Sequence, residues 1–142
     1  MRDPVLSIPR EAGISFGINA TLSLAFFLAV FGLEQRPLSW AMPDALAFDF
    51  VPQSMAVSLM SALVPALIAR KRFAMAIGLR SIVLRAIGFS LAGAVLGGLI
   101  ALLMERAGFA PVHWSIALAV KLAYGGSLGA LITSLTLQRM TR

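Results

Sequence analysis

The stretch AIGFSLAGAVLGGLIALLM, residues 86–104, has no charged side chain over its whole length. A bilayer core about 30 Å thick needs roughly 20 helical residues to cross it, so an uncharged run this long predicts a transmembrane helix. Residues 13–33 and 50–69 are also uncharged, and residues 112–137 carry only Lys121. The sequence therefore predicts an all-α integral membrane protein with four transmembrane helices.

The composition supports this class. Hydrophobic residues make up 59% of the chain and charged residues 13%, which is far more apolar than an ordinary soluble domain. We expect spans at about 13–33, 50–69, 84–104 and 112–137. These spans and their connections occupy nearly all of the 142 residues. The chain is therefore expected to form a single four-helix transmembrane domain over residues 1–142.

Basic residues lie mainly on one side of the predicted spans. Nine of the twelve Lys and Arg residues share that side: Arg2, Arg10, Arg70, Lys71, Arg72, Arg80, Arg85, Arg139 and Arg142. The opposite side has Arg36 and Arg106. Basic loops stay cytoplasmic, so we expect both termini in the cytoplasm, with the protein in a bacterial-type inner membrane.

The net charge of +6 would suggest nucleic acid as the partner of a soluble protein. Here the charges flank spans, so anionic lipid head groups on the cytoplasmic side are the expected partners, and no nucleic acid. The basic cluster is interpreted first as a determinant of topology and second as a lipid site. It consists of Arg70, Lys71, Arg72, Arg80 and Arg85.

The two halves of the chain resemble each other. Residues 16–35 align with residues 87–106, and each half contains a span, an acidic outer turn, a span and a basic inner end. Two spans per half would give a parallel repeat. Apolar helices also resemble one another by chance, and in either case we expect a bundle of two hairpins.

Small residues recur every four positions in the last two spans. Close backbone approach at such rows drives helix association in lipid, where no hydrophobic force acts between helices. The glycines concerned are Gly93, Gly97 and Gly98 in the third span and Gly125, Gly126 and Gly129 in the fourth. Two readings stay open: the third and fourth spans pack on each other within one subunit, or one row contacts another subunit or partner.

Lys121 is the one charge inside a span, and an ionisable residue in a membrane is a functional candidate by default. The structural reading is that its amine snorkels toward water or reaches an outer acid: Glu34, Asp44 or Asp49. The functional reading is that it lines an outward-facing cavity with Tyr124 and binds anions or anionic lipids.

Other polar positions in the spans are less decisive. Asn19, Gln53 and the hydroxyl residues near them could hydrogen-bond between helices or line a path. Asp49 precedes Pro52 and is expected to cap the second helix. The segment before residue 84 is expected to form either a short interfacial helix or an early start of the third span.

Catalysis is not expected. No Asp or Glu lies within a predicted span, there is one His, and there is no Cys. We therefore expect no metal site and no cofactor. The predicted function is that of a small non-catalytic membrane protein acting through helix contacts, as a homo-oligomer or an accessory subunit. The alternative is a small transporter or channel for an anion or lipid that uses Lys121.

Overall fold

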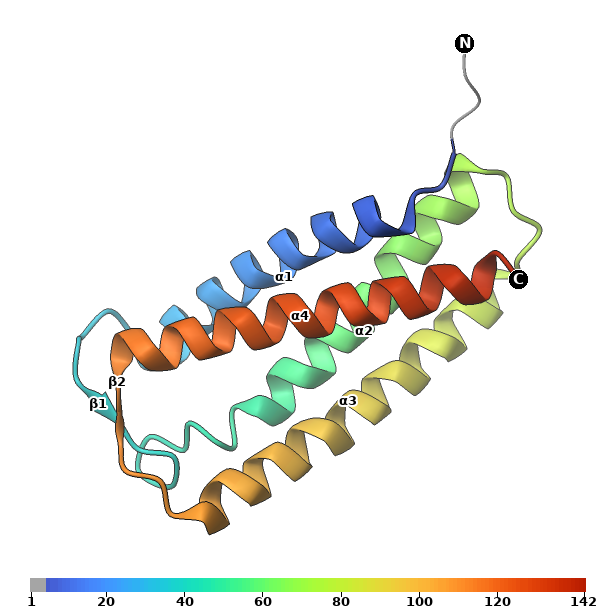
Figure 1. Cartoon of the computed structure of the whole chain (residues 1–142). Helices are drawn as coiled ribbons and strands as arrows, with labels where there is room; N and C mark the ends of the chain where they lie inside the picture. The colour runs from blue at the N-terminus through green and yellow to red at the C-terminus, as the bar shows by residue number, and fades with distance from the viewer. Residues whose placement is uncertain (1–4) are drawn as a thin grey trace.

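The computed structural model describes residues 5–142, so Arg2 lies outside the described residues. It contains four long helices, drawn in Figure 1: α1 (Ile8–Phe31), α2 (Phe50–Arg72), α3 (Leu79–Ala107) and α4 (Trp114–Met140). All four are long and apolar enough to cross a membrane. The predicted all-helical class with four candidate membrane spans is confirmed.

Each helix extends beyond its predicted span at the end of the bundle that carries most of the basic residues. At the other end, α1 and α4 are each two residues shorter than predicted. α1 begins at Ile8 and has a proline in its first turn. Proline is favourable there because N–H groups of the first turn have no acceptor within the helix. α3 begins at Leu79, so the early start of the third span is confirmed and a separate interfacial helix is not formed. α3 ends before Gly108, whose φ of 64° lies in the left-handed region that favours glycine.

The helices pack in the order α1, α4, α2, α3. α1 packs along α4, α4 packs along α2, and α2 packs along α3, whereas α1 and α2 meet at few positions. Figure 1 shows α3 and α4 converging near the chain termini and diverging toward the other end. The bundle is therefore an open row of helices, and its helix pairs are not the two self-packed hairpins that we expected.

Three apolar clusters hold the row together. One joins α1 to the start of α4 around Phe27, and the others join α2, α3 and α4 around Leu128 and Leu137. The outer surface is also apolar, with Leu91, Val95 and Leu99 of α3 more than half exposed. Exposed apolar surface of this extent is typical of helices that face lipid.

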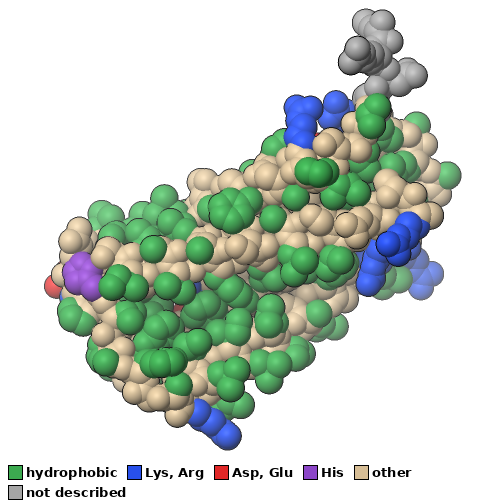
Figure 2. Space-filling view, in the orientation of Figure 1, with side chains coloured by type: hydrophobic (Ala, Val, Ile, Leu, Met, Phe, Trp, Pro, Cys, Tyr) green, Lys and Arg blue, Asp and Glu red, His purple; other side chains and the backbone are tan. Residues whose placement is uncertain are grey.

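The two ends of the bundle differ. At the strand end, β1 (Pro37–Leu38) pairs antiparallel with β2 (Val112–His113). Trp114 Nε1 donates a hydrogen bond of 2.9 Å to the Gly32 carbonyl, which ties α4 to the end of α1. At the opposite, basic end lie both ends of the described chain and most of the Lys and Arg side chains visible in Figure 2.

Candidate functional site

A buried ion pair lies near the strand end. Lys121 Nζ of α4 is 2.8 Å from Asp49 Oδ2, and the two side chains are only 2% and 8% exposed. The amine also lies 3.8 Å from the centre of the Phe50 ring, close enough for a cation–π interaction. The pair joins the N-cap of α2 to the N-terminal third of α4.

Asp49 has a different role from the one predicted. It stands at the N-cap position of α2, but its side chain makes no capping hydrogen bond and its backbone is helical. The expected cap is therefore wrong, because the carboxylate binds Lys121 instead. The partial positive charge of a helix N-terminus also stabilises a carboxylate at this position.

The snorkelling reading of Lys121 is wrong, since its side chain is nearly inaccessible to solvent. The other structural reading, contact with an outer acid, is confirmed for Asp49. The amine and the carboxylate are 2.8 Å apart, and both side chains are shielded from solvent. The interaction is thus mainly that of two close opposite charges, which is strong where water is excluded.

Hydrogen bonds extend from the ion pair toward the middle of the bundle. Gln53 Nε2 donates to Ser23 Oγ of α1 at 3.1 Å and to the Lys121 carbonyl at 3.0 Å. Ser54 of α2 and Tyr124 of α4 are joined by a hydrogen bond between their hydroxyls. Gln53 therefore joins three helices, as the interhelical reading predicted, and Tyr124 lies beside the ion pair on α4.

A second polar cluster lies nearer the basic end. Asn19 Nδ2 of α1 donates to Ser61 Oγ of α2 at 3.0 Å. Thr133 Oγ1 of α4 donates to Ser15 Oγ at 2.7 Å and to the Ser61 carbonyl at 3.2 Å. These bonds satisfy polar groups that could find no water in hydrocarbon, and they join the same three helices.

The two clusters form one polar seam inside an apolar shell. Its buried members are Ser15, Asn19, Ser23, Asp49, Gln53, Ser54, Ser58, Ser61, Lys121 and Thr133. Sequence reasoning did not single out Ser15 or Thr133 as polar partners. The signal was present in α1, because Ser15, Asn19 and Ser23 recur every four residues and so share one helix face.

Asn19 Oδ1 and Gln53 Oε1 are buried and accept no hydrogen bond within the described chain. A buried acceptor without a donor is uncommon in proteins and is costly to keep. Both residues line cavities between α1 and α2. The seam thus contains two amide oxygens without a hydrogen-bond donor, on residues that line these cavities.

The glycines of α3 contact α2. A Cβ at Gly97 would lie 2.5 Å from the Phe50 carbonyl oxygen and 2.8 Å from Val51 Cα. A Cβ at Gly93 would lie 2.6 Å from the Ser54 carbonyl oxygen. The absence of a side chain therefore lets the backbones of α3 and α2 approach closely.

The glycines of α4 contact α1. A Cβ at Gly125 would overlap the Ser23 hydroxyl, and one at Gly129 would overlap the Asn19 amide. The expectation that the third and fourth spans pack on each other through these rows is wrong, because α2 and α1 occupy them. Sequence spacing identified the contact rows but not their partners.

The basic cluster frames the connection between α2 and α3. Arg70, Lys71 and Arg72 form the last turn of α2, where cations complement the helix dipole. The Arg72 guanidinium lies 5.5 Å from the centre of the Phe73 ring. Arg80 and Arg85 follow in the first two turns of α3.

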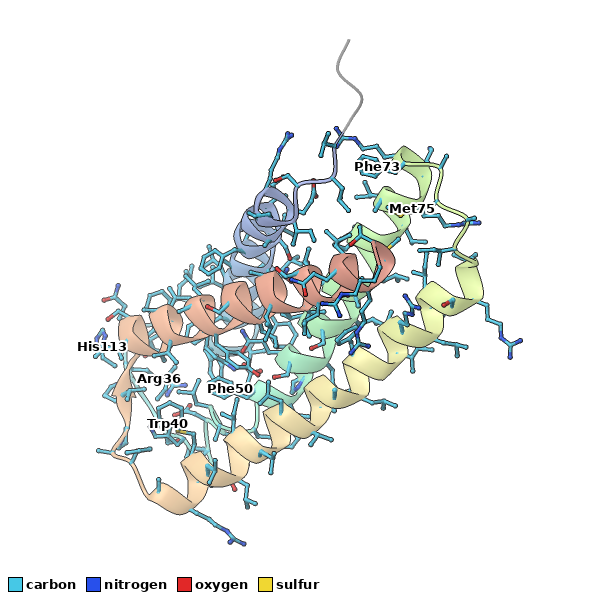
Figure 3. The ribbon with its side chains drawn as sticks, turned by 45° about the vertical axis from the view of Figure 1, so that its right-hand side comes forward. Arg36, Trp40, Phe50, Phe73, Met75 and His113 are labelled. Carbon is cyan, nitrogen blue, oxygen red and sulfur yellow. The ribbon has the colours of Figure 1, made fainter. Side chains whose placement is uncertain are left out.

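The labelled side chains of Figure 3 mark both ends of the bundle. At the strand end, Arg36 Nη2 donates to Asp44 Oδ1 at 2.7 Å. This bond and one from the Ser39 N–H lower the pKa of Asp44 to about 2. An unfolded Asp titrates near about 4, so the pair stabilises the loop above that pH and loses its effect as the pH falls toward 2.

The described residues contain no group of three or more His, Cys, Asp or Glu side chains that could hold a metal ion. His113 has a local role, because its ring accepts a hydrogen bond from the Ser115 N–H at the start of α4. The seam presents a buried amine, a carboxylate, two amides and several hydroxyls.

Comparisons with protein-family models, with curated proteins and with solved structures found no match to this chain.

Proposed function

We propose that this chain is a small non-catalytic multi-pass protein of a bacterial-type inner membrane that acts through helix contacts. It assembles as a homo-oligomer or as an accessory subunit of a larger membrane complex. The observation that supports this proposal is a row of small residues on α3, at the edge of its contact with α2, that the described helices cover only in part. The row consists of Ser90, Ala94 and Gly98.

α3 is held on one side only. Of its 29 residues five are buried, and they form one stripe that faces α2. A Cβ placed on Gly98 would meet nothing within 4 Å, whereas one on Gly126 would meet the Phe16 ring. Ser90 of this row donates a hydrogen bond to the Met55 carbonyl of α2, so the row is open at its Gly98 end.

An open small-residue row favours a protein partner over lipid. Lipid tails are as apolar as leucine, so a leucine face gains nothing from a protein neighbour, whereas small residues gain close packing with another helix. α3 presents such a row beside its contact with α2. A helix of a second copy or of a partner subunit would bury this row.

We expect Gly98→Leu to separate the assembly while leaving each chain folded. A leucine there fills open space in the monomer, so the free energy of unfolding should change by no more than about 0.5 kcal/mol. The added side chain should hold off a neighbouring helix, and the particle in mild detergent should shrink to one chain. Native mass spectrometry and thermal unfolding measure the two effects.

Gly88→Leu is the matched control. Gly88 is equally open, lies on the same helix and is outside the row of Gly98. This variant should keep the wild-type mass and stability. If Gly98→Leu also keeps the wild-type mass, the open row is not an assembly surface.

The packing order supports the proposed two-helix repeat. In such a repeat, α1 of the first half corresponds to α3 of the second half, and α2 corresponds to α4. The contact of α1 with α4 then becomes that of α3 with α2, and the contact of α2 with α4 maps onto itself. Two parallel repeats with α2 and α4 at the centre would produce this order.

The proposed orientation has both termini in the cytoplasm, because basic loops are retained there. Reporters fused after Thr141 and between Arg72 and Gly78 should report the cytoplasm. A reporter near Pro37 should report the opposite side. A C-terminal reporter on the side opposite the cytoplasm would contradict this topology.

Transport of a small anion or a lipid is the second candidate. The observation that favours it is the charged pair Lys121–Asp49, buried inside a candidate membrane helix bundle. An anion would have to replace the Asp49 carboxylate at the amine. Transport would therefore require the pair to open during each cycle.

A further inference from the structure

A groove runs between α1 and α2, the two helices that meet at few positions. Its half nearer the basic end has a volume of about 180 Å³ and extends along α1 from Glu11 to Leu22. Its other half has a volume of about 380 Å³ and extends to Phe26. The two halves share Asn19, Leu22 and Met60, so they form one continuous groove.

The length of the first half matches one leaflet of a bilayer. Glu11 and Leu22 are roughly 16 Å apart along α1, at about 1.5 Å per residue. One leaflet of a hydrocarbon core about 30 Å thick is about 15 Å deep. The walls are mostly apolar, with Ile14 and Ile18 on one side and Val64 and Ile68 on the other. This half therefore has the depth and chemistry to hold one acyl chain.

Two opposite charges stand where this groove reaches the basic end. Glu11 and Arg72 line one hollow, which shares Glu11, Pro65 and Ile68 with the groove. Neither side chain has an ion-pair partner within residues 5–142. Glu11 lies in the first turn of α1, where the helix dipole favours a carboxylate. The Phe73 ring lies beside the Arg72 guanidinium.

We propose that this groove binds one phospholipid with an ethanolamine head group, from the leaflet at the basic end. One acyl chain lies between α1 and α2, the phosphate binds the guanidinium of Arg72, and the ammonium donates to the carboxylate of Glu11. A guanidinium recognises phosphate oxygens in pairs. A choline group has no N–H to donate, and a glycerol head group has no cation for Glu11.

The test uses the full chain in vesicles of equal parts phosphatidylethanolamine, phosphatidylglycerol and phosphatidylcholine. After extraction in mild detergent, native mass spectrometry counts the retained lipids. We expect one lipid per chain, with phosphatidylethanolamine enriched about threefold relative to each of the other two lipids, as for an ion pair open to water. Glu11→Gln should remove the enrichment and leave the total number of retained lipids unchanged.

Two further variants separate the head group from the chain. Arg72→Gln should lower retention of all three lipids about fivefold, the usual effect of one basic residue at a membrane surface. Lys71→Gln is the matched control, because Lys71 does not line the hollow, and it should retain lipid like wild type. Met60→Trp should block the groove and lower retention of all three lipids.

The proposal is overturned if wild type retains lipids in the proportions of the vesicle. It is also overturned if Lys71→Gln and Arg72→Gln have equal effects, which would indicate diffuse charge attraction. A protein helix bound in place of lipid would overturn it as well. Because Gly98 lies on α3, Gly98→Leu should leave lipid retention unchanged, and this test is independent of the proposed assembly.

Discussion

Lys121→Met is expected to destabilise the protein by about 3–5 kcal/mol, the cost of removing one partner from a buried ion pair. The methionine fills much of the same space, but Asp49, which is 8% exposed, loses its counter-charge. The free energy of unfolding in mild detergent, measured by denaturant titration, checks this expectation.

A double variant separates the charge from the packing. Lys121→Met combined with Asp49→Leu removes both charges, and replacing a whole buried pair by apolar side chains is often neutral or stabilising. Much of the lost stability should therefore return in the double variant, giving a coupling energy between the two sites. If Lys121→Met alone unfolds like wild type, the ion pair does not support the fold.

The same variants address the transport candidate. Lys121→Arg keeps the charge and should preserve more of the stability than Lys121→Met. If Lys121 serves an anionic ligand, a folded Lys121→Arg protein should also keep part of the binding. Anion binding that persists in the folded double variant would exclude Lys121 as the ligand-binding group.

Gly97→Leu is expected to cost about 3 kcal/mol or more, at the upper end for overpacking. Its Cβ would clash with the Phe50 carbonyl and Val51 Cα, and these are backbone atoms that no rotamer change can move. α3 must then separate from the first turn of α2, which also carries Asp49. Thermal and denaturant unfolding measure the loss.

Gly126→Leu is the matched control in the other glycine helix. Its Cβ would lie 2.9 Å from the Phe16 ring, a side chain that is 42% exposed and can turn away. The cost should therefore be clearly smaller than at Gly97. Equal stability of both variants and wild type would show that close backbone approach at Gly97 does not matter.

The sequence was sufficient to predict the four helices, because each depends on a local property. Uncharged runs such as residues 86–104 are long enough to cross a bilayer wherever they occur in the chain. The ends were less accurate, since α3 begins in the mixed segment before residue 84 and continues to Ala107. Residues at helix ends can be helical or non-helical, so the sequence places these boundaries less accurately.

The helix pairing could not be predicted from the same information. The rows at Gly93 and Gly125 show that a helix approaches closely, but a row of small residues fits any neighbour. The partners are set by matching surfaces far apart in the chain, such as Gly125 against Ser23. The chain order suggested hairpins, and the packing order is different.

The candidate site was predicted in part. Lys121 stood out because a lone charge in a span needs a partner, and three acids were available. The choice of Asp49 depends on where α2 begins relative to α4, which is a tertiary property. Most of the other seam residues in α1 and α2 were identified as polar positions. Ser15 was missed, although it shares the four-residue spacing of Asn19 and Ser23 in α1.

The native mass of the wild-type protein after mild detergent extraction tests the central claim most directly. Native mass spectrometry should find two or more copies of the chain, or the chain with a stoichiometric membrane-protein partner. A single chain that carries only lipid, at concentrations where other membrane assemblies persist, would contradict a function through helix contacts.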